Sequence, residues 1–329
     1  MSIFFSVIIP LYNRPGEIKE LLESLTRQTY YNFEVLVIED GSEKDAREIV
    51  ESFKSRLQVY YFYKPNSGPG LSRNYGCARA KGDYFIIFDS DCIIPSPYFQ
   101  LVSNVLITEK FDFYGGPDRS HPDFSAMQKA VSYAMTSLLT TGGIRGQKKH
   151  VNVFHPRSFN LGMSKTTFAE TGGFSTMRYG EDIEFSIRAI RMGFKSGLIP
   201  EAYVYHKRRT NLRKFFIQVW HSGRARIHLY QLYPDQLKLV HWFPFLFTLG
   251  FISIPVLLVF STCPGIFLAL FYGLYTILLM IDASIRNKNI TVGLYSIAAS
   301  YIQMFGYGSG FLKEGFEMVF QPKDKRLFF

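Results

Sequence analysis

Residues 84–91 read YFIIFDSD, an apolar run of five residues that passes directly into two aspartates separated by one serine. A short apolar run bounded by polar residues is typical of a strand buried on both faces of a sheet. Asp89 and Asp91 then stand at the carboxyl end of that strand, where two carboxylates can hold one hard divalent cation. The pattern therefore predicts a strand over 84–88 followed by a site for Mg²⁺ or Mn²⁺.

The chain before this run alternates strand and helix patterns. Apolar runs predict three more strands, and stripes of apolar residues with helical spacing predict helices between them, the first opened by Pro15. This β-α-β-α-β-α-β order predicts an α/β fold with a Rossmann-like, mainly parallel sheet flanked by helices and joined by right-handed crossovers. The expected strands lie at 5–10, 34–39 and 58–63, and the expected helices at 15–25, 46–53 and 71–80.

Polar or glycine-rich segments follow every one of these strands, at 12–16, 40–42, 65–70 and 89–91. In parallel sheets the carboxyl ends of the strands meet at one edge, and ligands gather there. We therefore expect these four segments to converge on a single site.

A second acidic signal is Tyr179-Gly180-Glu181-Asp182, which opens a predicted helix over 182–191 with Ile183, Ile187 and Ile190 buried. Acidic residues in a first helical turn often serve only as caps and dipole partners. The functional alternative is a general base that takes a proton from an attacking hydroxyl. We favour Asp182 as this base, with Glu181 positioning it or the acceptor.

Five stretches together resemble the inverting GT-A glycosyltransferases of family 2, over about residues 3–230. They are FSVIIPLYNRP at 5–15, VLVIEDGS at 35–42, NSGPGLSRNYGCARAKGDYFIIFDSD at 66–91, GGF at 172–174 and GEDIEFSIR at 180–188. The resemblance implies a GT-A fold, a nucleotide-sugar as co-substrate, a divalent ion, and transfer to an acceptor by a single inverting displacement.

The resemblance also implies roles for single residues. Pro10, Tyr12 and Asn13 match the first nucleotide loop, and Asp40 matches the acid on the nucleobase or ribose, a role that Glu39 shares here. The segment that closes over the nucleotide is matched by Gly68, Arg73 and Asn74, with Arg73 facing the diphosphate. The metal and ribose motif is matched by Asp89, Ser90 and Asp91, and the catalytic base by Asp182. His206 resembles a late histidine near the metal, although a lone histidine is more often structural.

The C-terminal third changes character. Residues 243–260 carry no charge, residues 265–281 form another apolar run, and the break between them contains Pro264. Spanning a bilayer takes about 20 apolar residues, with roughly 17 as the lower limit, so the two runs predict a helical membrane hairpin; the alternative is a pair of buried helices in a soluble domain. A weaker segment at 290–312 is expected to be interfacial or re-entrant. We accordingly expect a GT-A domain over 1–230 and a membrane-associated helical region over 231–329.

Basic residues flank the hairpin at 207–226 and 286–288, which by the positive-inside rule places both flanks in the cytoplasm. The formal charge of +10 with only 19% charged residues suits anionic lipid heads or phosphorylated substrates. Nucleic acid is disfavoured because neither zinc-finger spacing nor an arginine-rich arm is present. Three scattered cysteines fit a reducing cytosol, and the first residues show no signal-peptide pattern. We expect location at the plasma (inner) membrane, with the catalytic domain on the cytoplasmic side.

The acceptor is expected to be a lipid-linked glycan in cell-surface polysaccharide synthesis, bound by residues within 115–160, including Asp118, Arg119, His121, Arg145, Arg157 and Asn160. A predicted amphipathic helix over 124–138 is either core packing or acceptor-facing. Gln218–Arg224 is similar to the Q-x-x-R-W helix of processive synthases, but Trp220 and Arg224 stand in the wrong order. A processive polysaccharide synthase and a non-catalytic membrane scaffold remain as alternatives. The sugar, the nucleobase and the oligomeric state stay open.

Overall fold

A computed structural model describes residues 2–142 and 154–320 of the chain. The described residues form two compact units: unit 1 contains residues 2–121 and 154–207, and unit 2 contains residues 122–142 and 208–320. This division differs from the expected boundary at residue 230. The segment 208–230 joins unit 2 because its helix packs along the last helix of the chain, and 122–142 joins it for the same reason.

Unit 1 is built on a seven-stranded sheet with the strand order β3-β2-β1-β4-β8-β6-β9. The first four strands are parallel, as predicted, whereas β8 runs antiparallel to both of its neighbours. The predicted strand bounds are confirmed to within one residue. The strands are β1 (Phe5–Leu11), β2 (Phe33–Asp40), β3 (Val59–Lys64), β4 (Tyr84–Phe88), β6 (Phe113–Gly115), β8 (Asn160–Ser164) and β9 (Ser196–Leu198).

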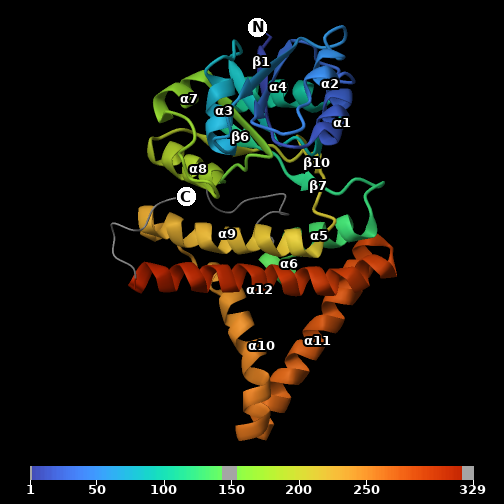
Figure 1. Cartoon of the computed structure of the whole chain (residues 1–329), viewed down its shortest axis with the longest axis vertical. Coiled ribbons are helices and arrows are strands. Elements are labelled where there is room, and N and C mark those ends of the chain that lie inside the picture. Colours follow the sequence, from blue (N-terminus) through green and yellow to red (C-terminus); the bar gives the residue numbers. More distant parts are fainter. Residues whose placement is uncertain (1, 143–153, 321–329) are drawn as a thin grey trace. The chain divides into compact units, whose positions relative to one another are not determined.

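Helices cover both faces of this sheet (Figure 1). Alternate residues of each strand face opposite sides, so Val7 and Ile9 join a core with α1, α2 and α4, while Ile8 joins a core with α3, α7 and α8. The helices are α1 (Pro15–Leu25), α2 (Arg47–Glu51), α3 (Pro69–Cys77), α4 (Tyr98–Glu109), α7 (Lys165–Thr171) and α8 (Glu181–Arg191). In α8 the expected burial holds for Ile187 only, because Phe185 and Ala189 fill the core positions instead.

A second, three-stranded sheet has the order β5-β10-β7 and lies at the end of β4. Its strands are β5 (Cys92–Ile93), β7 (Asp118–Arg119) and β10 (Val204–His206). The antiparallel pairing of β5 with β10 sets Cys92 opposite His206. Directly opposed residues in an antiparallel pair present their side chains on the same face, so this small sheet brings a late histidine to the DSD segment.

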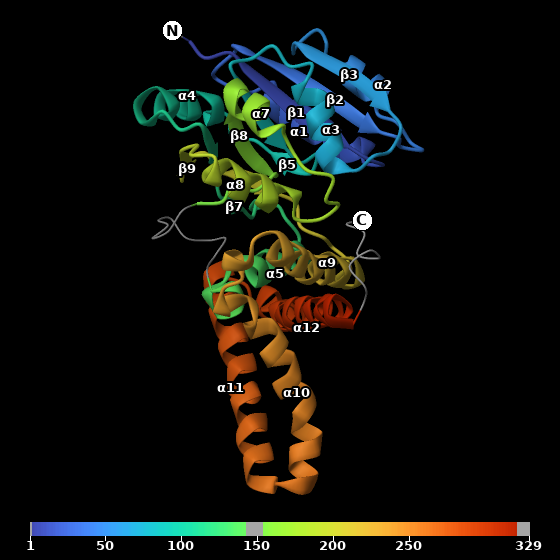
Figure 2. The same ribbon diagram turned by 90° about the vertical axis from the view of Figure 1, so that its left-hand side faces the viewer.

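Unit 2 is helical. Figure 2 shows α9 and α12 together and, below them, α10 and α11 as a hairpin. The helices are α5 (Ala126–Thr136), α6 (Leu138–Thr141), α9 (Leu212–Leu232), α10 (Phe243–Phe260), α11 (Thr262–Asn287) and α12 (Ile290–Phe320), with short 3₁₀ turns at Pro234–Gln236 and Leu239–His241. The predicted amphipathic helix is α5, and its apolar face packs on α9 and α12 through Val131, Phe215 and Ala299. Core packing, not an exposed face, therefore explains its periodicity.

Glycines let α9 and α12 approach to backbone contact. A Cβ atom on Gly223 would lie 2.2 Å from the Tyr307 carbonyl oxygen, and one on Gly310 would lie 2.1 Å from that of Trp220. Beside this contact Glu314 accepts from Arg224 Nε at 2.5 Å and meets His228 Nε2 at 2.6 Å. The basic residue of the Gln218–Arg224 segment thus pairs within the helix layer.

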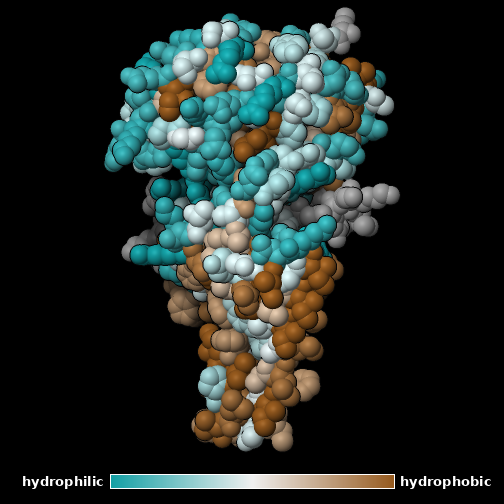
Figure 3. Space-filling model, turned by 90° about the vertical axis from the view of Figure 1, so that its right-hand side faces the viewer, coloured by the Kyte–Doolittle hydropathy of each residue, from teal (hydrophilic) through white to brown (hydrophobic). Residues whose placement is uncertain are grey.

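The hairpin exposes apolar side chains along both of its helices. Two stretches are long and apolar enough to cross a membrane by length and composition: Leu239–Phe260, with mean hydropathy 2.3, and Thr262–Asn287, with mean hydropathy 2.0. In the apolar segments of these two stretches only 6% and 17% of the residues are buried, respectively. Figure 3 shows hydrophobic surface gathered over the hairpin. Among the described residues α12 does not meet the same criterion.

Candidate active site

The loops that follow the parallel strands are held together by hydrogen bonds between side chains and backbone. The Asn13 N–H donates to Ser42 Oγ at 2.7 Å, and Asn13 Oδ1 accepts from the Glu43 N–H at 2.9 Å. Glu39, fully buried, contacts Ser42 Oγ and accepts from the Ala46 N–H at 3.0 Å. Asn13 and Glu39 thus hold the loops together, whereas Tyr12 is half exposed at the same edge.

Asp40 organises the loop that precedes α3. Its Oδ1 accepts from the Ser67 N–H at 2.9 Å, its Oδ2 accepts from the Gly68 N–H at 2.9 Å, and Lys64 pairs with it. Gly68 has φ of 90°, a left-handed conformation that favours glycine. The 40–42 and 65–70 segments therefore converge with the first loop, as predicted, and Pro10 lies near the end of β1.

Asn74 and Arg73 link α3 to distant parts of unit 1. The Asn74 side chain donates to the Phe174 carbonyl at 2.7 Å and accepts from the Phe174 N–H at 2.8 Å. This pair of bonds fixes the glycine-glycine-Phe turn. The Asn74 amide thereby binds protein backbone through both its oxygen and its nitrogen.

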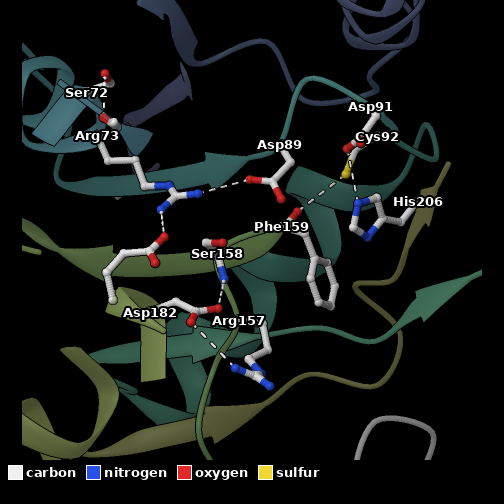
Figure 4. A network of polar contacts seen from close by, with 12 residues as sticks. Ser72, Arg73, Asp89, Asp91, Cys92, Arg157, Ser158, Phe159, Asp182 and His206 are labelled. Carbon is white, nitrogen blue, oxygen red and sulfur yellow. Dashed lines mark hydrogen bonds and ion pairs between the residues drawn. The ribbon is translucent and has the colours of Figure 1, made fainter. Parts of the chain in front are cut away.

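Arg73 is a buried cation between two carboxylates (Figure 4). Its Nη1 donates to Glu181 Oε1 at 2.5 Å and its Nη2 donates to Asp89 Oδ1 at 3.2 Å. Only 3% of Arg73 is exposed. The side chain expected to face the diphosphate therefore connects the end of β4 to the start of α8. Burial raises the pKa of Glu181, and the adjacent Asp182 adds to this, against the opposing effect of Arg73.

Asp182 directly follows Glu181 and makes contacts of its own. Its Oδ2 accepts from the Ser158 N–H at 3.2 Å, and its Oδ1 lies 3.5 Å from Arg157 Nη1. Burial opposes ionisation of Asp182, but the Arg157 charge and the Ser158 N–H outweigh it and lower the pKa. Asp182 is thus a carboxylate at neutral pH, the form that a proton acceptor requires.

Asp91 is nearly buried and touches two basic side chains. Arg14 Nη1 donates to its Oδ2 at 2.7 Å, and His206 Nε2 lies 3.1 Å from its Oδ1. Burial opposes ionisation, yet His206 and Arg14 lower the pKa of Asp91 well below its usual range. Ser90, between the two aspartates, is buried. Asp89 keeps a partly exposed side chain.

The side chains around Asp91 include a group that could hold a divalent ion, and this group overlaps with the expected ligands without matching all of them. Within residues 2–142 and 154–320, the donor atoms that lie close enough to share one ion belong to Asp91, Cys92 and His206. Asp91 and His206 are two of the three residues expected to bind the ion, and their role as ligands stays a prediction. Asp89 is not in that group and instead pairs with Arg73. A carboxylate and an imidazole suit Mn²⁺, and a carboxylate alone suits Mg²⁺.

The residues expected near the acceptor divide into separate groups. Asn160 is fully buried and binds Tyr98 and the Ala202 carbonyl, so it is part of the core. Arg119 stacks on Tyr203 at 3.7 Å, and His121 packs edge-on against Tyr205. Among them Arg157 contacts the candidate base, and Asp118 lies 3.9 Å from His206 Nδ1. Arg145 lies outside the described residues.

The sequence analysis did not predict that three further residues belong to the site: Arg14, Cys92 and Ser158. Arg14 directly follows the first nucleotide loop and was available as a cation beside a predicted phosphate site. Cys92 directly follows the DSD segment. Ser158 acts through its backbone N–H, and a backbone contact leaves no signal in residue identity.

Comparisons with known proteins identify the family of the chain. Residues 6–170 match the family model described as glycosyl transferase family 2. That is half of the chain, so the chain belongs to glycosyl transferase family 2.

Curated relatives match smaller parts. An uncharacterized glycosyltransferase of Rickettsia bellii is 44% identical over 128 residues, 39% of this chain and 18% of the relative. The first three relatives, all from Rickettsia, are matched over about a fifth of their own length. An uncharacterized glycosyltransferase of Haemophilus influenzae is 28% identical over 219 residues, 63% of this chain and 70% of the relative. Chondroitin synthase of Escherichia coli is 29% identical over 237 residues, 61% of this chain and 34% of that protein.

Solved structures share the fold. The mannosyltransferase PcManGT from Pyrobaculum calidifontis, solved with GDP-Man and Mn²⁺, has a TM-score of 0.65 at 15% identity, over 93% of this chain and 88% of that chain. Residues 1–349 of S. aureus TarS give 0.50 at 18% identity, over 92% and 90%. At such identities the likeness concerns the fold, and it supports the GT-A architecture.

Proposed function

We propose that the chain is an inverting glycosyltransferase that moves a sugar from a nucleotide-sugar to an acceptor hydroxyl. The observation that carries the proposal is the contact network that joins Glu181, the residue before the candidate base, to the DSD segment. Glu181, next to Asp182, is linked to Asp89 through Arg73, which pairs with both carboxylates. Asp91, two residues after Asp89, contacts His206. Carboxylates from β4 and α8 thus face one region of unit 1.

In this proposal the loops around Tyr12, Asp40 and Gly68 bind the nucleoside, and Asp89, Ser90 and Asp91 bind the ribose and the diphosphate. A Mg²⁺ or Mn²⁺ ion held by Asp91 and His206, with Asp89 adjacent, neutralises charge on the diphosphate when bound. Arg73 holds Asp89 and Glu181 in place. The fold neighbour solved with GDP-Man and Mn²⁺ supports the choice of a nucleotide-sugar with a divalent ion.

Asp182 takes the proton of the acceptor hydroxyl as that oxygen attacks the anomeric carbon from the face opposite the diphosphate. The bond from the sugar to the diphosphate breaks as the new glycosidic bond forms, so the configuration inverts. Arg157 and the Ser158 N–H keep Asp182 ionised before the reaction. General-base assistance of this kind contributes about 10²- to 10⁴-fold to a rate.

We further propose that the α10–α11 hairpin anchors the protein in the plasma (inner) membrane with unit 1 in the cytoplasm. Exposed apolar side chains over two helices of sufficient length support this, and the basic flanks agree with the orientation. A membrane anchor favours a lipid-linked glycan as the acceptor, in cell-surface polysaccharide synthesis.

The test is Asp182→Asn, compared with Glu170→Gln on the exposed surface of α7. Asp182→Asn should lower turnover by about 10²-fold or more, while nucleotide binding measured by calorimetry stays intact. Glu170→Gln should match the unmodified protein in both measurements. Turnover close to normal in Asp182→Asn would remove this carboxylate from the mechanism.

A processive polysaccharide synthase is the second candidate, favoured by the similarity to E. coli chondroitin synthase. The length of the radiolabelled product separates the two activities. A single added sugar supports the first proposal, and a ladder of products supports polymerisation.

A further inference from the structure

Cys92 lies beside the metal-binding residues and has no role in the proposed transfer. It directly follows Asp91, and it pairs with His206 across the β5–β10 ladder. The carboxylate, thiol and imidazole donor atoms of these three residues lie within 4.8 Å of one another. The cysteine thus belongs to the same cluster of donor atoms as two of the three expected metal ligands, Asp91 and His206.

The surroundings hold these side chains in a restricted arrangement. Cys92 is 1% exposed, and its Sγ lies 3.6 Å from the Phe159 carbonyl oxygen. The Phe159 ring stacks on His206 with a centroid distance of 5.1 Å. Figure 4 shows Cys92, Asp91 and His206 together, with Phe159 alongside. A site whose side chains are already held in place binds a metal without first ordering its ligands.

His206 turns its two ring nitrogens towards two different carboxylates, although the second lies beyond hydrogen-bond distance. Its Nε2 faces Asp91 at 3.1 Å, while its Nδ1 lies 3.9 Å from Asp118 Oδ2. Histidines that bind metals usually direct the second ring nitrogen to a carboxylate, which orients the ring. Donor atoms bound to one zinc ion at about 2.0–2.3 Å stand only about 3–4 Å apart, so small side-chain adjustments bring the three groups onto one ion.

We propose that Asp91, Cys92 and His206 form one mixed oxygen, sulfur and nitrogen site that takes thiophilic divalent ions. This inference rests on the proposed function only because Asp91 and His206 are also the proposed ligands of the ion that binds the nucleotide-sugar. Thiolate selects ions such as Zn²⁺, Co²⁺ and Cd²⁺, whereas Mg²⁺ prefers oxygen ligands. On binding, the sulfur–metal bond forms as the thiol proton leaves to solvent.

The experiment uses the full chain in detergent, titrated with Co²⁺ and followed by absorbance. Sulfur ligation produces a thiolate-to-cobalt band in the near ultraviolet, separate from the visible bands of the ion itself. We expect this band in the unmodified protein and in Cys77→Ser, a buried cysteine in the other core cluster. Cys92→Ser should lose the band.

Affinities give a second readout. The Kd for Cd²⁺ should rise at least about tenfold in Cys92→Ser, the lower end of what loss of a metal-site partner costs, while the Kd for Mg²⁺ changes by less than about twofold. A third readout needs no variant: ¹¹³Cd NMR of the unmodified protein reports sulfur ligation from the chemical shift alone, whatever the serine substitution does to folding.

Two results would overturn the inference. One is Co²⁺ that binds through Asp91, shown by its loss in Asp91→Asn, but without the near-ultraviolet band. The other is the absence of Co²⁺ and Cd²⁺ binding. Transfer measured separately with Mg²⁺ or Mn²⁺ decides the proposed function, so the two ideas fail on different readouts.

Discussion

At the scale of single residues, Arg73 is a buried cation that neutralises two carboxylates from different elements. Removing the cation leaves Glu181 buried without its partner, and loss of one partner of a buried ion pair costs about 3–5 kcal/mol. We expect Arg73→Met to lower the stability of unit 1 by about this amount and to displace Asp89. Thermal unfolding measures the loss. Arg79→Met, an exposed arginine in the turn after α3, is the control and should change stability by less than about 1 kcal/mol.

Loss of nucleotide binding should accompany the lower stability of Arg73→Met, since Asp89 is a proposed ligand of the ribose or diphosphate. Stability equal to that of the Arg79 variant would show that the buried ion pairs are not needed to maintain the site.

At the scale of helices, the contact between α9 and α12 depends on glycines at the crossing. Gly310→Ala would place a Cβ atom against the Trp220 carbonyl oxygen, and backbone cannot yield as a side chain can. Overpacking of this kind costs about 1–3 kcal/mol. In the same helix Gly315→Ala meets nothing closer than 4.0 Å, so it should be neutral or stabilising by up to about 1 kcal/mol. Unfolding midpoints of the two variants in detergent test the difference, and equal midpoints would contradict it.

Glu314 makes the same helix pair sensitive to acid. Burial opposes its ionisation, but His228 and Arg224 lower the pKa of Glu314 to about 2. A carboxyl with a lowered folded pKa stabilises the protein above its unfolded pKa and loses that stabilisation as the pH falls towards the folded value. Stability should therefore decrease between about pH 5 and pH 2, by about 1–3 kcal/mol.

Thermal unfolding across this pH range tests the Glu314 prediction. Glu314→Gln should show a shallower dependence on pH than the unmodified protein. Glu317→Gln, a carboxyl three residues along α12 that pairs with Lys313, should keep the normal dependence. Parallel curves for Glu314→Gln and the unmodified protein would exclude Glu314 as the acid-sensitive group.

At the scale of the whole molecule, the α10–α11 hairpin is the proposed membrane anchor. Leu270 is 68% exposed in α11, and a charge at the centre of a membrane helix costs about 2.5–3.5 kcal/mol. Leu270→Arg should reduce the fraction that stays with membranes after alkaline extraction. Ile107→Arg, at an apolar position 56% exposed in α4 of unit 1, should leave that fraction unchanged. Equal retention of both variants would remove the hairpin as the anchor.

The sequence by itself determined the first four strands of unit 1, the helices between them, the helix that begins near Asp182, and the class of protein. Strands such as β4 and helices such as α1 are encoded by periodicities of two and 3.6 residues, which depend on neighbours in the chain and so are readable without coordinates. The position of the acidic pairs after β4 and at the start of α8 was readable for the same reason. The two apolar runs of the hairpin were also evident from composition.

Only the tertiary structure decided which side chains meet. Arg73 pairs with Glu181, 108 residues away, and Asp91 meets His206 through the pairing of β5 with β10. Neither contact leaves a periodic trace, because each depends on how strands and helices from distant parts of the chain pack. The assignment of α9 to the helical unit likewise required the glycine contacts with α12. Local patterns specify the helices and strands, whereas packing decides which of them come into contact. The candidate site is formed by such contacts between residues that are distant in the chain.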